Sequence, residues 1–203
     1  MFTMVMVGID LGSQLAGTTA IAFLNGDEVI IRQSNKGKSA DDFVQNQLKE
    51  LPVGSLIGID APLSLPEVYS KEALDLTEEP DFHYRECDKE VKAMSPMFLG
   101  GLTARAMKLS HHLQQEGLKI FEVYPKMVFQ NSIQNRGGYK KKWNRELALN
   151  WVKELEDKFG FHLQSDLENW HQFDAILALT ATLKIYRGDA QKVGDENEGV
   201  IYF

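Results

Sequence analysis

Two short stretches of the chain are near copies of each other and end in an aspartate. Residues 7–10 (VGID) and 57–60 (IGID) are apolar, β-type runs in which a glycine stands two residues before the aspartate. A crossover connection would make the two strands parallel, so that Asp10 and Asp60 emerge at the same carboxyl edge of a sheet. Because the side-chain period of a strand is two residues, the shared spacing predicts matched directions for the two carboxylates. The alternative is that each aspartate only ends a strand or begins a turn.

Two further acids stand in apolar surroundings. Glu122 lies inside the strand-like run 118–124 (LKIFEVY), where a buried carboxylate needs a partner or a metal ion. Asp174 lies in the apolar helical run 170–186, on the same face as Leu177 and Ala181, and this face is expected to meet the sheet. The alternatives are an edge strand that exposes Glu122 to water, and a first-turn Asp174 that complements the helix dipole.

Gathered at one edge of the sheet, these four carboxylates would raise one another's pKa values, and hard divalent cations relieve such repulsion. Oxygen ligands suit Mg²⁺ and Mn²⁺, so the pattern indicates a site for one or two of these ions. Two ions about 3.5–4 Å apart would activate a water and stabilise the leaving oxygen of a phosphodiester. His171, one helical turn before Asp174, is a candidate proton carrier, or alternatively a cap or packing residue. The candidate catalytic and metal-binding acids are Asp10, Asp60, Glu122 and Asp174.

Charge is unevenly distributed along the chain. A net charge of −7 argues against a non-specific nucleic-acid binder, but residues 136–145 (RGGYKKKWNR) hold five basic residues and no acid. We expect this segment to contact phosphates, with Tyr139 or Trp143 available to stack on a base. The alternative is a solvated loop that leads into a helix whose Trp143 packs on the core. The candidate substrate-binding residues in this segment are Lys140, Lys141, Lys142 and Arg145.

Two arginines flank the irregular middle of the chain, part of which, residues 67–90, is rich in acids. Arg85 and Arg105 could each clamp a phosphate with two parallel hydrogen bonds, which completes the set of expected substrate-binding residues. The alternative for each is an ordinary surface or salt-bridge arginine.

The order of the expected elements predicts an α/β fold with a mixed five-stranded sheet. Asn25-Gly26 is a strong hairpin signal between the second and third strands, so the chain begins with an antiparallel meander. A crossover helix that starts near Ser39 then leads to parallel strands. Residues 65–117 are interpreted as a helical insertion or cap within a single domain spanning 1–203. The expected strands are 4–10, 18–24, 28–32, 56–60 and 118–124, with helices over 142–158 and 170–186 and a short terminal strand over 199–203.

Composition is that of an ordinary globular domain. Of the 203 residues, 43% are apolar and 25% are charged, enough to bury a sizeable core. No apolar run approaches the roughly 20 residues that cross a bilayer, so we expect no membrane partner. Because Cys87 is the single cysteine, an intramolecular disulfide is excluded, which fits a cytoplasmic location. No neighbouring residues would activate this thiol, so we expect it to be unreactive.

An ordered set of short motifs carries a resemblance to a known family. The chain resembles a family of uncharacterised prokaryotic proteins described as predicted RNase H-fold nucleases, and the resemblance spans nearly its whole length. It implies an RNase H-like fold, carries Asp10, Asp60 and Asp174 over as metal-binding acids, and adds Glu122 as a candidate fourth. The layout of the three aspartates is also similar, more distantly, to that of Holliday-junction resolvases. The motifs are GID at 8–10, IDAPLSLP at 59–66, RECD at 85–88, EVYP at 122–125, the lysines at 140–142 and HQFDAILAL at 171–179.

The sequence is compatible with three alternative functions. The first is a metal-dependent nuclease, a hydrolase that cleaves the phosphodiester bonds of nucleic acid with Mg²⁺ or Mn²⁺. The second is nucleotide binding or phosphoryl transfer, because residues 8–22 (GIDLGSQLAGTTAIA) resemble the first phosphate loop of the actin, hexokinase and heat-shock ATPase superfamily. The third is a non-catalytic module that binds a metal or nucleic acid. Fold alone does not choose between them.

Overall fold

The centre of the sheet is built by strands from the first 60 residues. The computed structural model describes residues 4–70 and 80–203. In it, β1 (Met6–Asp10), β2 (Ala20–Asn25) and β3 (Glu28–Gln33) are antiparallel, and β4 (Leu56–Asp60) runs parallel to β1. Gly26 takes a φ of +66° in the turn between β2 and β3, as a tight hairpin requires. Helix α1 (Ala40–Leu48) makes the crossover and is capped by Ser39, which accepts a hydrogen bond from the N–H of Asp42.

Two more strands complete the sheet within the described residues. Strand β5 (Lys119–Glu122) pairs in parallel with β4, and β6 (His162–Leu163) pairs in parallel with β3, so the order is β5-β4-β1-β2-β3-β6. The predicted mixed sheet, antiparallel and then parallel, is confirmed. The predicted number of five strands is corrected to six, because β6 is only two residues long and shows no alternation that a sequence pattern could reveal.

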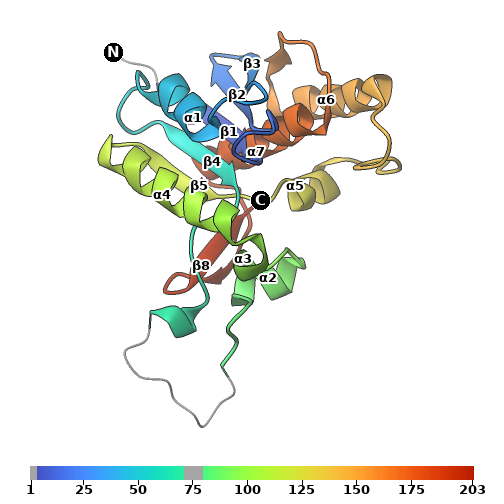
Figure 1. The fold of residues 1–203 in the computed structure, drawn as a ribbon. Coiled ribbons are helices and arrows are strands. Elements are labelled where there is room, and N and C mark those ends of the chain that lie inside the picture. The colour runs from blue at the N-terminus through green and yellow to red at the C-terminus, as the bar shows by residue number, and fades with distance from the viewer. Residues whose placement is uncertain (1–3, 71–79) are drawn as a thin grey trace.

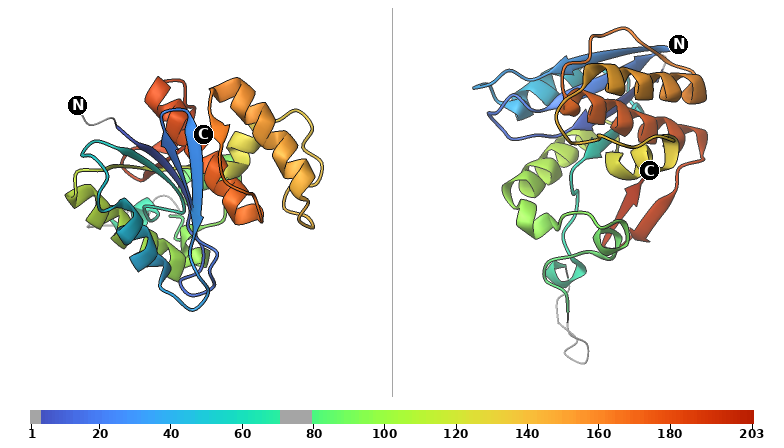
Figure 2. Two further views of the ribbon diagram at one scale, coloured as in Figure 1. Left: turned by 90° about the horizontal axis from the view of Figure 1, so that it is seen from above. Right: turned by 90° about the vertical axis from the view of Figure 1, so that its right-hand side faces the viewer.

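Helices cover both faces of the sheet (Figures 1 and 2). On one face, α1 and α4 (Gly101–Gln115) bury a cluster that includes Val7, Ile57 and Leu113. On the other face lies α7 (Trp170–Arg187), with α5 (Pro125–Ser132) and α6 (Arg145–Phe159) packed against its outer side. Helix α7 is buried without interruption from residue 172 to residue 183, so it forms the centre of this half of the molecule. No helix in the described part of the chain is long and apolar enough to span a membrane.

The expected insertion over 65–117 divides into two parts. Helix α4 packs against α1 and β5 and is therefore the crossover helix between β4 and β5, inside the core. The rest of this segment, together with the last strands of the chain, forms a lobe below the sheet in Figure 1. Residues 71–79 of the expected insertion lie outside the described residues. A parallel bridge between Val123 and Tyr202 joins the lobe to the sheet. The lobe contains η1 (Glu67–Tyr69), α2 (Glu86–Val91), α3 (Pro96–Leu99), β7 (Lys192–Asp195) and the expected terminal strand β8 (Gly199–Tyr202).

The two glycines of the repeated motif are the points where α7 meets the sheet. Gly8 and Gly58 are partners in adjacent strands. A Cβ at position 8 would lie 1.9 Å from the backbone nitrogen of Leu179, and a Cβ at position 58 would lie 2.3 Å from Oγ1 of Thr182. Thr182 Oγ1 also donates a hydrogen bond of 3.1 Å to the carbonyl oxygen of Val7. The glycines therefore let the α7 backbone approach to a distance that no other residue permits.

Replacing Gly8 tests this contact. We expect Gly8→Ala to lower the free energy of unfolding by about 3 kcal/mol or more, because the obstacle is helix backbone that cannot rotate away. Gly101→Ala is the matched control, since nothing lies within 4 Å of a Cβ at that position. Urea unfolding followed by circular dichroism measures both changes. An equal, small effect for the two variants would contradict the close packing of α7.

Candidate active site

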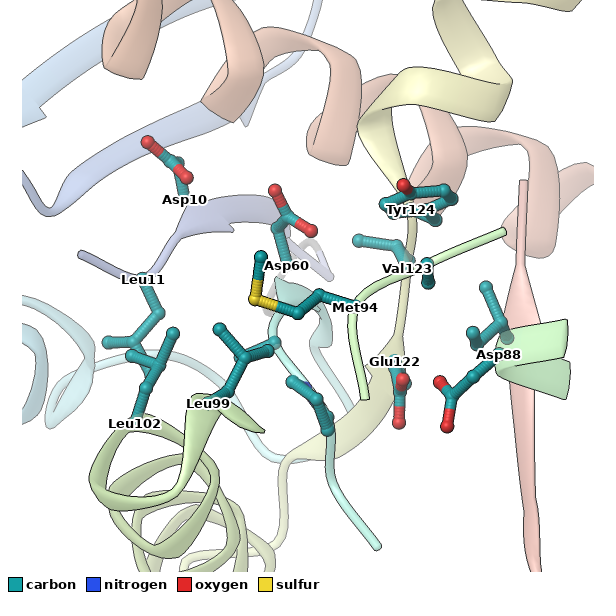
Figure 3. A pocket seen from close by; sticks show the side chains of 14 residues that line it. Asp10, Leu11, Asp60, Asp88, Met94, Leu99, Leu102, Glu122, Val123 and Tyr124 are labelled. Carbon is teal, nitrogen blue, oxygen red and sulfur yellow. The ribbon is translucent and has the colours of Figure 1, made fainter. Parts of the chain in front are cut away.

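The end of the sheet next to α7 brings the two repeated aspartates together. Asp10 and Asp60 are direct partners in the register of β1 and β4. Each lies two residues after a glycine that faces α7, so both side chains face α7 as well. Figure 3 shows the two carboxylates at the ends of adjacent strands and directed the same way. Asp10 and Asp60 therefore lie together at one edge of the sheet, as predicted.

Helix α7 adds His171 and Asp174 to this edge. His171 Nδ1 lies 2.7 Å from Oδ2 of Asp10 and donates to it, since an ionised carboxylate only accepts. Asp174 is 1% exposed and is the fifth residue of the helix, beyond the first turn. Asn169 supplies the helix cap instead, by accepting from the N–H groups of His171 and Gln172. Asp174 therefore is not explained by the helix dipole, whose effect is confined to the end turns.

Two consecutive residues of the basic segment hold the Asp174 carboxylate. Tyr139 donates from its hydroxyl to Oδ1 at 2.7 Å, and Lys140 forms an ion pair with Oδ2. The Tyr139 ring stacks on Phe129 with ring centres 4.2 Å apart, and this stacking holds the Tyr139 hydroxyl against Asp174. Lys140 has a left-handed backbone with φ of +60°, a conformation that costs a non-glycine residue free energy. The strained residue is thus the one whose ammonium group lies beside the acids.

The three aspartates are close enough to influence one another's ionisation. Burial raises the pKa of Asp60 well above its usual value, and the charges of Asp10 and Asp174 raise it further. Within the described residues, no donor makes a hydrogen bond or ion pair with the Asp60 carboxylate. Burial also raises the pKa of Asp174 to about 6, although the Lys140 charge opposes this. The hydrogen bond to Asp10 raises the pKa of His171. The site thus holds more negative charge than its own cations balance.

This donor set suits a hard cation in its chemistry, because carboxylate oxygens are the ligands that Mg²⁺ and Mn²⁺ prefer. In the arrangement present, however, no group of three or more histidine, cysteine, aspartate or glutamate residues among those described could hold a metal ion. Asp10 is bonded to His171 and Asp174 to Lys140, whereas Asp60 faces them without a donor. The aspartates are therefore suitable metal ligands by residue type, but Asp10 and Asp174 are already paired with basic side chains of the protein itself.

Glu122 and Arg85 lie apart from the three aspartates. Both oxygens of Glu122 accept from Arg85, at 2.6 and 2.7 Å, and Oε2 also accepts from the N–H of Leu63. Arg85 is fully buried and also pairs with Asp88 through Nε and Nη2. Figure 3 shows Glu122 pointing away from Asp10 and Asp60, toward Asp88. The structure thus differs from the expectation of a fourth metal ligand and a phosphate clamp: the two residues satisfy each other.

Two of the other four expected phosphate contacts are paired with acids away from the three aspartates. Arg105 pairs with Asp41 at 2.6 Å and donates to the carbonyl oxygen of Gly12, while Arg145 pairs with Asp166 on the surface. Lys141 and Lys142 are exposed beside Lys140. The expected stacking aromatics pack inside instead: Tyr139 and Trp143 both pack edge-to-face against Trp170.

Cys87 is excluded as a nucleophile by its surroundings. The thiol is fully buried, and burial raises its pKa to about 12. At neutral pH it is therefore protonated, and a protonated thiol neither attacks a substrate nor binds a metal.

A pocket of about 230 Å³ opens beside Asp10 and Asp60 (Figure 3). It extends from the carboxyl ends of the strands to the start of α4 and the lobe. Sequence patterns did not reveal it, because its walls come from segments far apart in the chain and consist of ordinary apolar residues. Its side chains include Leu11, Met94, Leu99, Leu102, Val123 and Tyr124.

Comparison of the chain with protein-family models and with curated proteins finds no match. The geometry of this site is therefore the basis for inferring the function of the protein.

The unbalanced charge predicts that one acid destabilises the protein. We expect Asp60→Asn to raise the free energy of unfolding of the metal-free protein at pH 7 by about 1 kcal/mol, because it removes a carboxylate repelled by Asp10 and Asp174. Asp88→Asn, the same change at a buried acid paired with Arg85, should instead destabilise the protein. Chemical unfolding of both variants in the presence of a chelator measures the difference. A loss of stability in Asp60→Asn would contradict the charge assignment.

Proposed function

We propose that this protein is a metal-dependent nuclease that hydrolyses phosphodiester bonds. The observation that carries the proposal is the convergence of Asp10, Asp60 and Asp174, from two strands and one helix, with Asp60 lacking a donor among the described residues. An RNase H-like fold is part of the proposal. It is supported by the order β5-β4-β1-β2-β3 within the sheet, in which β1, β2 and β3 are antiparallel and β4 and β5 are parallel to β1.

The roles of the residues follow from their contacts. A bound Mg²⁺ or Mn²⁺ would supply Lewis-acid stabilisation of the phosphate oxygens. Asp10, Asp60 and Asp174 are the residues that would hold it. His171, oriented by Asp10 and about two-fifths exposed on its side chain, is placed to take or give a proton at its other ring nitrogen. The exposed Lys141 and Lys142 directly follow Lys140 in the chain and would contact the substrate backbone.

The phosphoryl-transfer alternative gains no support from the loop after β1. Its backbone N–H groups at Gly12 and Ser13 donate to the hydroxyls of Thr19 and Thr18. A phosphate loop needs such groups free to bind the nucleotide.

Removing one acid tests the proposal. Purified protein should cleave some DNA or RNA in a screen of single strands, duplexes and junctions with Mg²⁺ or Mn²⁺, and not with a chelator. We expect Asp10→Asn to lower the cleavage rate at least a hundredfold, because it removes both a metal ligand and the partner of His171. Asp157→Asn, on the exposed side of α6, is the control and should keep full activity. Cleavage that survives Asp10→Asn would refute the proposed mechanism.

A second test concerns Lys140, which neutralises Asp174 in the structure. A cation at the same carboxylate competes with this ammonium group. We expect Lys140→Met to lower the melting temperature without metal and to enlarge the rise in melting temperature that Mn²⁺ produces. Lys141→Met, the adjacent exposed lysine, should change neither value. A smaller metal-induced rise in Lys140→Met would mean that Lys140 supports the metal rather than competes with it.

A further inference from the structure

The pocket beside the acids differs in character from the site it adjoins. Its acidic lining residues are Asp10, Asp60, Asp88 and Glu122, and the other described residues that line it are apolar or aromatic. Asp88 and Glu122 are both hydrogen-bonded to Arg85, so the carboxylates left for a ligand are Asp10 and Asp60 at one end. A ligand that fits this arrangement carries a flat apolar body joined to a group that reaches the acids.

The walls of the pocket are suited to a planar ring. Tyr124 offers a half-buried aromatic face, and Leu99 and Leu102 offer branched apolar surface from α3 and α4. Met94 also lines the pocket and is 60% exposed, so a flexible thioether forms part of its solvent-facing rim. Aromatic and apolar side chains of this kind hold nucleobases without reading their sequence.

The basic residues near the aspartates, which do not line the pocket themselves, favour a nucleotide over a positively charged ligand. A free amine would suit the Asp60 carboxylate, but Lys140 already forms an ion pair with Asp174, and Lys141 and Lys142, which follow it in the chain, are exposed. These ammonium groups attract a phosphate backbone and repel a cation. An anionic chain with apolar rings, which is what a nucleic acid is, satisfies both features.

We propose that the pocket receives one unpaired nucleobase next to the phosphate that lies at Asp10 and Asp60. This inference rests on the proposed nuclease function and narrows its substrate class. A base stacked and paired within a continuous duplex cannot enter a pocket, whereas an unpaired base swings out at little free-energy cost. The substrates are therefore nucleic acids that contain an unpaired nucleotide at or beside the cleaved bond, such as single strands, bulges or branch points.

The test compares two methionines of the same lobe. Met94→Asp places a charge at the exposed rim of the pocket, whereas Met97→Asp makes the same change at a 36% exposed position that does not line it. Binding is measured by fluorescence anisotropy in Ca²⁺ with a labelled duplex that is either continuous or interrupted by one unpaired nucleotide, in DNA and RNA forms. We expect the wild type to bind the interrupted duplex about tenfold more tightly, and Met94→Asp, but not Met97→Asp, to remove this preference.

The outcomes separate this inference from the proposed function. Equal binding of both duplexes by the wild type, or a preference that survives Met94→Asp, would overturn the pocket assignment even if cleavage in Mg²⁺ or Mn²⁺ requires Asp10. A preference abolished by Met94→Asp in a protein that cleaves nothing would support the pocket and count against the nuclease. Absence of binding to every oligonucleotide would overturn both.

Discussion

The contact between α7 and strands β1 and β4 is the constraint on which the site depends. Because Gly8 and Gly58 carry no side chain, the helix backbone lies directly on the sheet, and Thr182 bonds to the carbonyl oxygen of Val7. Two residues after each glycine, the strand places an aspartate on the same face. The first turns of α7 then bring His171 and Asp174 to those aspartates. A helix held further away by ordinary side chains would leave the acids separated.

Bringing the three aspartates together costs electrostatic free energy, and the neighbouring side chains compensate the three carboxylates to different degrees. His171 is bonded to Asp10, and Lys140 is held against Asp174 by a strained backbone and by Tyr139. Asp60 has no comparable partner among the described residues, and the pKa of its carboxyl is raised by burial and by both neighbours. The second buried charge group shows the contrast, because Arg85 satisfies Glu122 and Asp88 together. A buried carboxylate with a raised pKa and no hydrogen-bond donor, as at Asp60 within the described residues, is typical of functional sites.

The parts of the site that depend on local periodicity could be predicted from the sequence. The strand endings gave the places of Asp10 and Asp60, and the helical period gave the buried face of Asp174. The reason for the glycines could not be predicted, since it lies in a helix more than 100 residues later. Glu122 shows the same limit: an acid in an apolar strand must have a partner, but the chain pattern does not say whether that partner is a metal or Arg85. The role of α4 in the core and the two-residue β6 likewise depend on tertiary contacts.

The buried Arg85 cluster also determines the shape of the pocket. Arg85 begins α2 and Glu122 ends β5, so their two hydrogen bonds tie the lobe to the sheet at a fixed distance. The chain leaves α2 and reaches Met94 within a few residues, which brings Met94 into the same pocket lining as Asp60. Breaking a buried ion pair of this kind leaves uncompensated charge and lets the tied elements separate. Arg85, which we expected to clamp a phosphate, and Glu122, which we expected to bind a metal, instead bond to each other and hold the apolar wall of the pocket beside the acids.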